Sequence, residues 1–151
     1  MKIPIDLKTG EVSVESKKEV IVGIDLGTTN SLIAYMSEGN PVTIKSGQGK
    51  NAIVPSVIYF NETGGVEVGE VAKSRLLTDS DRTIFSVKRL MGRSYEDVSH
   101  LSQMLGYDII DDKTSPMVKI RVGNRFFTPV ELSAEILKAL NREAEEFLDC
   151  L

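Results

Sequence analysis

The sequence predicts an α/β fold, with short strands and turns through most of the chain and one long helix at its carboxyl end. Residues 20–26 and 31–36 are short apolar runs rich in β-branched side chains, which is typical of buried strands. Residues 128–151 carry apolar side chains at three- and four-residue spacing, which predicts an amphipathic helix. At 151 residues, the chain has one domain's length and can bury a core.

Composition and charge argue against several classes of protein. The net charge of −4 disfavours a general nucleic-acid binder, which is usually basic. No apolar run reaches the length of about 18 residues that a membrane span needs, and the amino-terminal apolar stretch is too short for a signal peptide. Cys150 is the single cysteine and cannot form an internal disulfide, while His100 is the single histidine, so a metal site is not expected. We therefore expect a protein of the cytoplasm or of another reducing compartment.

The amino-terminal third predicts an arm followed by three strands. Residues 1–19 are polar and charged and should form a loosely held arm. After the two strands named above, residues 38–41 should turn the chain into a third strand at residues 42–45. Residues 46–51 predict a flexible loop with a Gly-x-Gly-Lys sequence. Ile44 stands where a P-loop requires its first glycine, so that motif is rejected.

The middle of the chain predicts a hairpin and three short helices. Residues 56–60 and 66–68 are strands joined by a turn that contains glycines. Gly69 should open a helix that reaches about Thr78, and residues 79–81 should end it and begin a second helix that carries Lys88. A third short helix, from a capping box formed by Ser94 and Asp97, should reach about Met104.

The last part predicts a second hairpin and the long helix. Strands are expected at residues 107–110 and 117–122, and a turn at residues 123–124 should lead into a partner strand at residues 125–127. Thr128 is the expected N-cap of the helix, with Pro129 at its first position and Glu131 completing a capping box. The expected buried face consists of Leu137, Leu140, Ala144, Phe147 and Leu151, and the wet face of Glu131, Glu135, Lys138, Arg142 and Glu146.

The polar turn between the first two strands has the chemistry of an anion site. Its residues, Gly27, Thr28, Thr29 and Asn30, can point several backbone N–H groups at one spot, with two hydroxyls and an amide around them. Asp25, at the end of the first strand, supplies the negative charge that Mg²⁺ requires. On pattern alone, a plain β-hairpin with a polar turn accounts for these residues equally well.

Lys88 is the second candidate for a functional residue. On its predicted helix, Ile84 lies four residues before it and Met91 three residues after it, so Lys88 shares a partly apolar face. The residues alone favour a structural role, in which the stem of the lysine covers the edge of the core.

Several motifs resemble one protein family. Residues 22–31 resemble the first phosphate loop of the DnaK-type heat-shock chaperones, stress-response ATPases of the actin-like (ribonuclease-H-like) fold. Similar motifs follow in the family's order at residues 54–57, 68–73, 86–93 and 132–137, so the resemblance covers about residues 20–149. The stretch that begins at Ser86, and the polar extension before the first strand, are most similar to the HscA branch, which serves iron–sulfur cluster assembly.

The resemblance implies a role for each candidate residue. Asp25 should hold Mg²⁺ through water, and the turn should wrap the β- and γ-phosphates of ATP, with the Thr28 hydroxyl near the transferred phosphate. Lys88 should reach the γ-phosphate and help to orient the attacking water, where a positive point charge stabilises phosphoryl transfer. Thr28 and Lys88 are thus the expected catalytic residues. Gly27, Thr28, Thr29, Asn30 and Lys88 are the expected nucleotide ligands. We interpret Glu67 as a surface residue and Glu70 as a complement to a helix dipole.

The resemblance also implies an incomplete ATPase lobe. Residues 20–50 and about 128–151 should form the base of the lobe, with a mixed sheet and flanking helices, and about 51–127 a smaller α+β upper subdomain. No glycine follows Gly123, so the family's second, glycine-rich phosphate loop is absent, as are the rest of the ATPase domain and the peptide-binding domain. We therefore expect this sequence alone to be inactive, and the exposed edge of its first strand to promote self-association.

The expected parent is an ATP-dependent chaperone that hydrolyses ATP to control peptide binding. Its expected partners are extended peptide clients, a J-domain co-chaperone and a nucleotide-exchange factor, without nucleic acid or membrane. Two alternatives stay open. One is half of a sugar or acetate kinase of the same fold, which would lack the motif of residues 86–93, and the other is a binding module that kept the lobe and lost catalysis.

Overall fold

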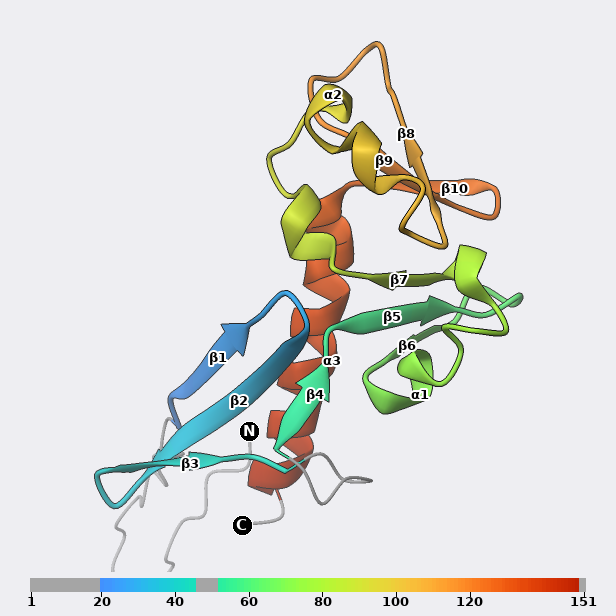
Figure 1. Ribbon diagram of the computed structural model, residues 1–151. Helices are drawn as coiled ribbons and strands as arrows, with labels where there is room; N and C mark the ends of the chain where they lie inside the picture. The colour runs from blue at the N-terminus through green and yellow to red at the C-terminus, as the bar shows by residue number, and fades with distance from the viewer. Residues whose placement is uncertain (1–19, 46–51, 150–151) are drawn as a thin grey trace, which may run out of the picture.

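The computed structural model describes residues 20–45 and 52–149 (Figure 1). Within these residues, three sheets lie along one long helix, α3 (Pro129–Asp149), which runs from the third sheet towards the first. Every described strand pair is antiparallel, so the parallel strand of the expected mixed sheet is not among the described residues. The predicted arm at residues 1–19, the loop at residues 46–51, Cys150 and Leu151 lie outside the described residues.

The first sheet contains the hairpin that the sequence predicts. Its strands are β1 (Val22–Leu26), β2 (Asn30–Ser37), β3 (Asn40–Thr43) and β4 (Ile53–Pro55), with β4 paired to the beginning of β2. The turn before β3 is two residues shorter than predicted, because Glu38 and Gly39 have positive φ angles of 49° and 83°. Such a turn matches the twist of the flanking strands and closes the hairpin tightly. The prediction of a strand at residues 42–45 was therefore displaced by two residues, and β4 was missed.

The second sheet corrects two helix predictions. It consists of β5 (Val57–Phe60), β6 (Val66–Val68) and β7 (Thr83–Phe85), in the order β6-β5-β7. The helix predicted from Gly69 to Thr78 is only one turn long, α1 (Glu70–Lys73). It ends there because the N–H groups of Arg75 and Leu76 donate to carbonyls three residues back, which tightens the backbone into turns.

The helix that was expected to carry Ile84 and Lys88 together does not form. A 3₁₀ turn, η1 (Ser80–Arg82), leads into β7, and a second one, η2 (Val87–Leu90), follows it. The β-branched and aromatic side chains of β7 favour a strand, and β7 pairs with the fully buried β5. Ser86 then adopts a left-handed conformation (φ 56°), which separates β7 from η2.

The third sheet agrees with its prediction. It consists of β8 (Asp108–Ile110), β9 (Lys119–Val122) and β10 (Arg125–Phe127), in the order β10-β9-β8. Before it, Ser94 and Asp97 form the predicted capping box at the start of α2 (Tyr95–Val98). The helix predicted to reach Met104 ends earlier, since η3 (Ser99–Leu101) follows α2 directly.

Helix α3 begins at its predicted cap, but its buried face is rotated slightly from the predicted one. The Thr128 N–H donates to Glu131 Oε2 (2.7 Å), and the Glu131 N–H donates to Thr128 Oγ1 (3.2 Å), so the capping box is confirmed. Leu140 and Ala144 are buried as predicted, but Leu137 is 37% exposed. The buried residues recur at three- and four-residue spacing, which leaves Leu137 beside them. They are Pro129, Leu132, Ser133, Ile136, Leu140 and Ala144.

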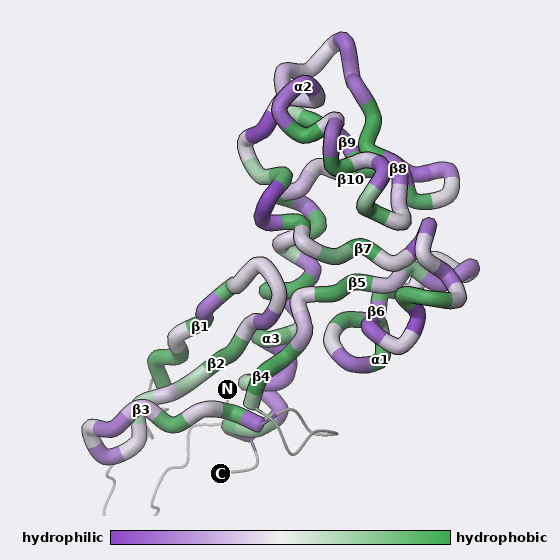
Figure 2. The backbone as a smooth tube through the Cα atoms, viewed as in Figure 1, coloured by the Kyte–Doolittle hydropathy of each residue, from purple (hydrophilic) through white to green (hydrophobic). Residues whose placement is uncertain are grey.

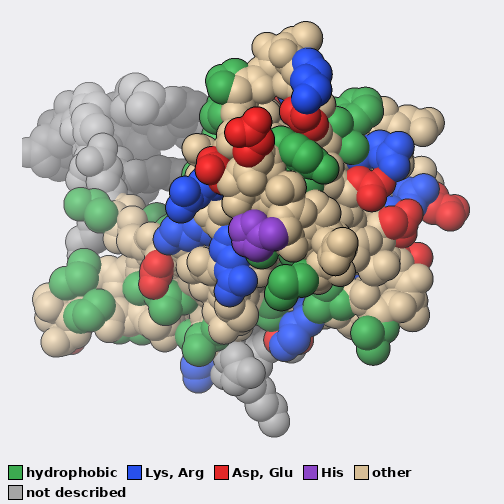
Figure 3. Space-filling view, turned by 45° about the horizontal axis from the view of Figure 1, so that its top comes forward, with side chains coloured by type: hydrophobic (Ala, Val, Ile, Leu, Met, Phe, Trp, Pro, Cys, Tyr) green, Lys and Arg blue, Asp and Glu red, His purple; other side chains and the backbone are tan. Residues whose placement is uncertain are grey.

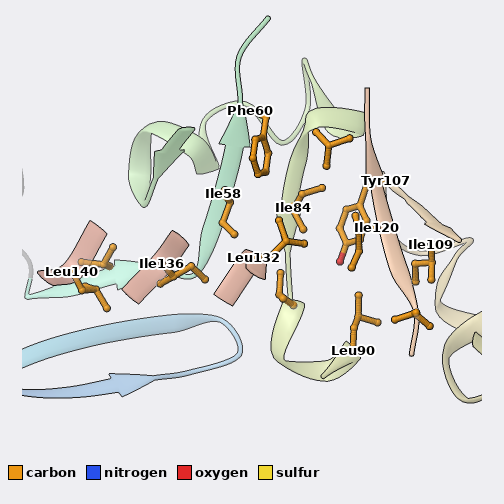
Figure 4. Packing of buried hydrophobic residues seen from close by; sticks show 14 of the residues in the cluster. Ile58, Phe60, Ile84, Leu90, Tyr107, Ile109, Ile120, Leu132, Ile136 and Leu140 are labelled. Carbon is orange, nitrogen blue, oxygen red and sulfur yellow. The ribbon is translucent and has the colours of Figure 1, made fainter. Parts of the chain in front are cut away.

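One apolar core connects α3 with all three sheets. Figure 4 shows Leu132 of α3 close to Ile58 and Ile84, with Ile120 of the third sheet beyond them. Figure 2 shows that apolar segments coincide with β5 and β7, while the tip of the β2–β3 hairpin is polar. Charged and apolar side chains are interspersed on the face drawn in Figure 3. Among the described helices, none combines the length and the apolar character that crossing a membrane requires.

Candidate functional site

The predicted phosphate turn lies between β1 and β2. The pair Leu26–Ser31 closes the hairpin, which leaves residues 27–30 as the connection. A Cβ atom at Gly27 would overlap the backbone carbonyl oxygen of Asn30, so only glycine fits this close approach. Thr28 is half-buried, and Thr29 and Asn30 are exposed. The turn therefore has a fixed, tight backbone and presents small polar side chains.

Ser56, which lies outside the hairpin, is hydrogen-bonded to this turn. It lies between β4 and β5 with its side chain buried, and its hydroxyl donates to the carbonyl oxygen of Gly27 (2.9 Å). Its N–H donates to the carbonyl oxygen of Thr29 (2.8 Å), and its Oγ lies 2.8 Å from Ser31 Oγ. The sequence reasoning missed Ser56, although the motif at residues 54–57 contains it. A serine inside an otherwise apolar, strand-forming run was the available signal, because a buried hydroxyl needs a partner.

Lys88 reaches the same corner of the molecule from η2, which follows β7. Its Nζ donates to the carbonyl oxygen of Leu26 (2.9 Å), the residue directly before the turn. Val87 and Leu90 anchor η2 in the core, while Lys88 itself is exposed. Its predicted neighbour Ile84 lies on β7 instead, so the expected helical face around Lys88 was wrong. The structure nevertheless brings Lys88 to the base of the turn.

Asp25 lies on β1 one residue before Leu26. It pairs with Leu32 of β2, and its side chain is exposed on the strand face opposite to Leu26. Among the described residues, no group of three or more metal-ligating side chains gathers at one place. Asp25 could therefore hold a cation only together with water or with ligands from outside the described residues.

A cavity of about 260 Å³ adjoins the turn on the side of β5. Thr28, Thr29 and Asn30 line it from the turn, and Lys73 lines it from the end of α1. Lys73 also forms an exposed ion pair with Glu70 at 3.6 Å, which is worth little in solvent. The remaining lining residues are Pro55, Ser56, Val57, Leu76, Phe85 and Ser86. The cavity has room for a small ligand group beside the turn.

Glu70 and Glu67, the two other acidic residues considered, differ in their exposure to solvent. Glu70 is exposed in the first turn of α1, where its charge complements the helix dipole, as predicted. Glu67 is half-buried rather than on the surface, and its Oε2 is buried without a hydrogen-bond partner among the described residues. The cross-strand neighbour Tyr59 is buried, which explains how β6 draws Glu67 inward.

Two residues around the third sheet have shifted pKa values. Hydrogen bonds from Lys119 and then Thr114 hold the pKa of Asp112 well below its usual value. Burial raises the pKa of Tyr107, whose hydroxyl donates to the Phe85 carbonyl oxygen (2.6 Å). These contacts stabilise the third sheet and its junction with β7, so they indicate a structural role.

Comparison with known proteins identifies the family. The family model for Hsp70 protein matches residues 21–150. A relative described as "Chaperone protein HscA homolog", from Aromatoleum aromaticum, is 43% identical over 139 residues, which cover 92% of this chain. The same alignment covers 22% of that relative, so the chain spans about a fifth of its length. The predicted resemblance is confirmed, and the chain belongs to the Hsp70 family, on its HscA-like branch, with the fold of part of an actin-like ATPase lobe.

Proposed function

We propose that this chain supplies one phosphate-binding corner of an ATP-dependent chaperone, in which ATP hydrolysis controls the binding of peptides. The observation that carries the proposal is the position of Lys88. Its ammonium group lies at the base of the turn formed by residues 27–30, although 62 positions separate Lys88 from Leu26, whose carbonyl it contacts. A cation beside a tight, glycine-containing turn is an arrangement suited to a polyphosphate.

The residues of the corner fit a nucleotide with Mg²⁺. Gly27 allows a close backbone approach, Thr28 and Thr29 carry hydroxyls, and Asn30 carries an amide. We assign the β- and γ-phosphates of ATP to this turn and the γ-phosphate to Lys88 as well. Asp25 would hold Mg²⁺ through water, and the ion would neutralise part of the phosphate charge. Thr28 and Lys88 are the proposed catalytic residues, because both would contact the transferred phosphate.

Several wider assignments belong to the same proposal. Residues 20–50 and about 128–151 would form the base of the lobe, and about 51–127 its upper subdomain. The complete chaperone would act in the cytoplasm on extended peptides, with a J-domain co-chaperone and a nucleotide-exchange factor. Similarity to an HscA homolog supports a specialised role in iron–sulfur cluster assembly. The 151 residues alone would bind ATP weakly and would not turn it over.

A binding module without catalysis is the competing function, whereas membership of the Hsp70 family excludes the kinase alternative. The two remaining functions differ in the role of the Thr28 hydroxyl. In the complete chaperone, Thr28→Val should slow single-turnover hydrolysis of Mg-ATP about a hundredfold, because it removes a contact to the transferred phosphate. Thr63→Val, on the exposed β5–β6 turn, is the matched control. Binding of Mg-ATP without any turnover in the wild type would instead support the binding module.

A further inference from the structure

Ser56 makes three hydrogen bonds towards the hairpin that carries the turn. Its side chain is only 3% exposed. The hydroxyl donates to the Gly27 carbonyl oxygen, the N–H donates to the Thr29 carbonyl oxygen, and Oγ lies beside Ser31 Oγ. One residue from outside the hairpin therefore contacts two carbonyls of the turn, that of Gly27 through its hydroxyl and that of Thr29 through its backbone N–H.

The proton of each hydroxyl can be assigned. A serine hydroxyl has one proton and two acceptor lone pairs. Because the Ser56 proton points to the Gly27 carbonyl, Ser31 must be the donor in the contact between the two hydroxyls. The bonds form a chain from Ser31 through Ser56 to Gly27, and each bond polarises the next one. Such a buried chain favours one orientation of the Gly27 peptide.

The orientation of two carbonyls fixes the orientation of two N–H groups. In a trans peptide, the C=O and the following N–H point in opposite directions, and the described chain has no cis peptide. Since the carbonyls of Gly27 and Thr29 point to Ser56, the N–H groups of Thr28 and Asn30 point away from it. Within the described residues, the Thr28 N–H donates no hydrogen bond. It is therefore available to a ligand.

We infer that Ser56 is a positioning residue for phosphate binding, which turns the N–H groups of Thr28 and Asn30 outward as a pair of donors. This inference rests on the proposed function of the turn. A buried serine with only a packing role would behave differently. Ser133 on α3 provides that comparison, because it is equally buried (4% exposed) and donates to Met91 Sδ (3.5 Å), far along the sequence from the turn.

The first experiment measures the turn without any ligand. Amide exchange and ¹⁵N shifts are recorded by NMR for the 151-residue chain and four variants: Ser56→Ala, Ser31→Ala, Ser56→Thr and Ser133→Ala. We expect Ser56→Ala to shift the resonances of residues 28–31 and to speed exchange of the residue-56 amide, which donates to the Thr29 carbonyl oxygen, about tenfold. Ser31→Ala should have a smaller effect, and Ser56→Thr should restore the wild-type spectrum by keeping the hydroxyl. Unchanged turn amides in both alanine variants, or changes equal to those of Ser133→Ala, would overturn the inference.

The second experiment adds Mg-ATP, and inorganic pyrophosphate as a probe without the nucleoside, at millimolar concentration. In the wild type, both should shift the amides of Thr28 and Asn30, and Ser56→Ala should weaken this response about tenfold more than Ser133→Ala does. Equal weakening in the two variants would overturn the positioning role. If the wild-type amides do not respond at all, the proposed function fails, while the ligand-free experiment still decides whether Ser56 orients the turn.

Discussion

The Nζ atom of Lys88 lies 2.9 Å from the carbonyl oxygen of Leu26, so η2, which follows the second sheet, contacts the last residue of β1 through one hydrogen bond. This contact joins η2 to the first sheet directly beside the turn. A lysine that only covers the edge of the core with its stem would leave its ammonium group in solvent instead of bonding it to that carbonyl. The contact therefore supports the assignment of Lys88 to the phosphate corner.

Gly27 and Gly23 provide a matched pair on the same hairpin. A Cβ atom at Gly27 would overlap the Asn30 carbonyl oxygen, whereas nothing lies within 4 Å of a Cβ atom at Gly23. We expect Gly27→Ala to destabilise the chain by about 1–3 kcal/mol and Gly23→Ala to change stability by less than about 0.5 kcal/mol. Urea midpoints measure both. Equal effects would mean that the turn relaxes and is not held tightly.

Leu140 and Leu137 test the packing of α3 in the same way. Leu140 is fully buried, while Leu137 is 37% exposed beside the buried residues. Leu140→Ala should cost about 2–5 kcal/mol, because it leaves a cavity between the helix and the sheets. Leu137→Ala should cost less than about 1 kcal/mol. A denaturant midpoint that is unaffected by Leu140→Ala would show that this face of α3 is not packed in solution.

The capping box predicts a specific loss of stability in acid. Hydrogen bonds from the Thr128 N–H and then the Thr128 hydroxyl lower the pKa of Glu131 from its ordinary value of 4.5. A carboxyl group whose pKa is lower in the folded state stabilises the fold above pH 4.5, and this contribution is lost as the pH falls through the folded value. Glu131→Gln keeps a capping side chain but cannot titrate, so its urea midpoint should fall less between about pH 7 and about pH 3 than that of the wild type. Glu146→Gln on the exposed face of α3 is the control, and identical pH dependence in all three proteins would contradict the prediction.

The outer edge of β1 predicts self-association of the 151-residue chain. Among the described residues, β1 pairs with β2 alone, and Ile21 beside it is 79% exposed. An apolar strand with a free edge can pair with a second chain. Light scattering at tens of micromolar should therefore detect dimers or larger species, and Ile21→Lys should reduce them. Leu77→Lys, at a loop residue that is 97% exposed, should not. A single monomer mass for the wild type would mean that the edge is covered.

Local signals in the sequence predicted the caps and the turn correctly. Ser94 with Asp97, and Thr128 with Glu131, form their capping boxes because the spacing alone places side chain and backbone within reach. The turn at residues 27–30 followed from its glycine and small polar residues. Each of these features depends on residues a few positions apart, which a sequence displays directly.

Contacts between distant segments account for what the sequence did not predict. β7 was taken for a helix, because only its pairing with the buried β5 selects a strand there. The contact of Lys88 with Leu26 was not predicted. The family resemblance assigned Lys88 to the γ-phosphate, whereas the residues alone favoured a structural lysine. Ser56 was overlooked, because its hydrogen-bond partners lie 25 and 29 positions away; the serine within an apolar run signals that a partner is needed, but not which residue it is.

Single-turnover hydrolysis of Mg-ATP by the complete chaperone tests the central claim most directly. If Lys88 acts on charge that develops at the γ-phosphate, Lys88→Ala should slow hydrolysis about a thousandfold or more and leave Mg-ATP affinity nearly unchanged. Lys88→Arg should not restore the rate, because a planar fork does not replace a point charge. Lys138→Ala, at an exposed lysine of α3, is the control. A Lys88→Ala protein that hydrolyses ATP at the wild-type rate would contradict the account, and Lys88 would then only brace β1.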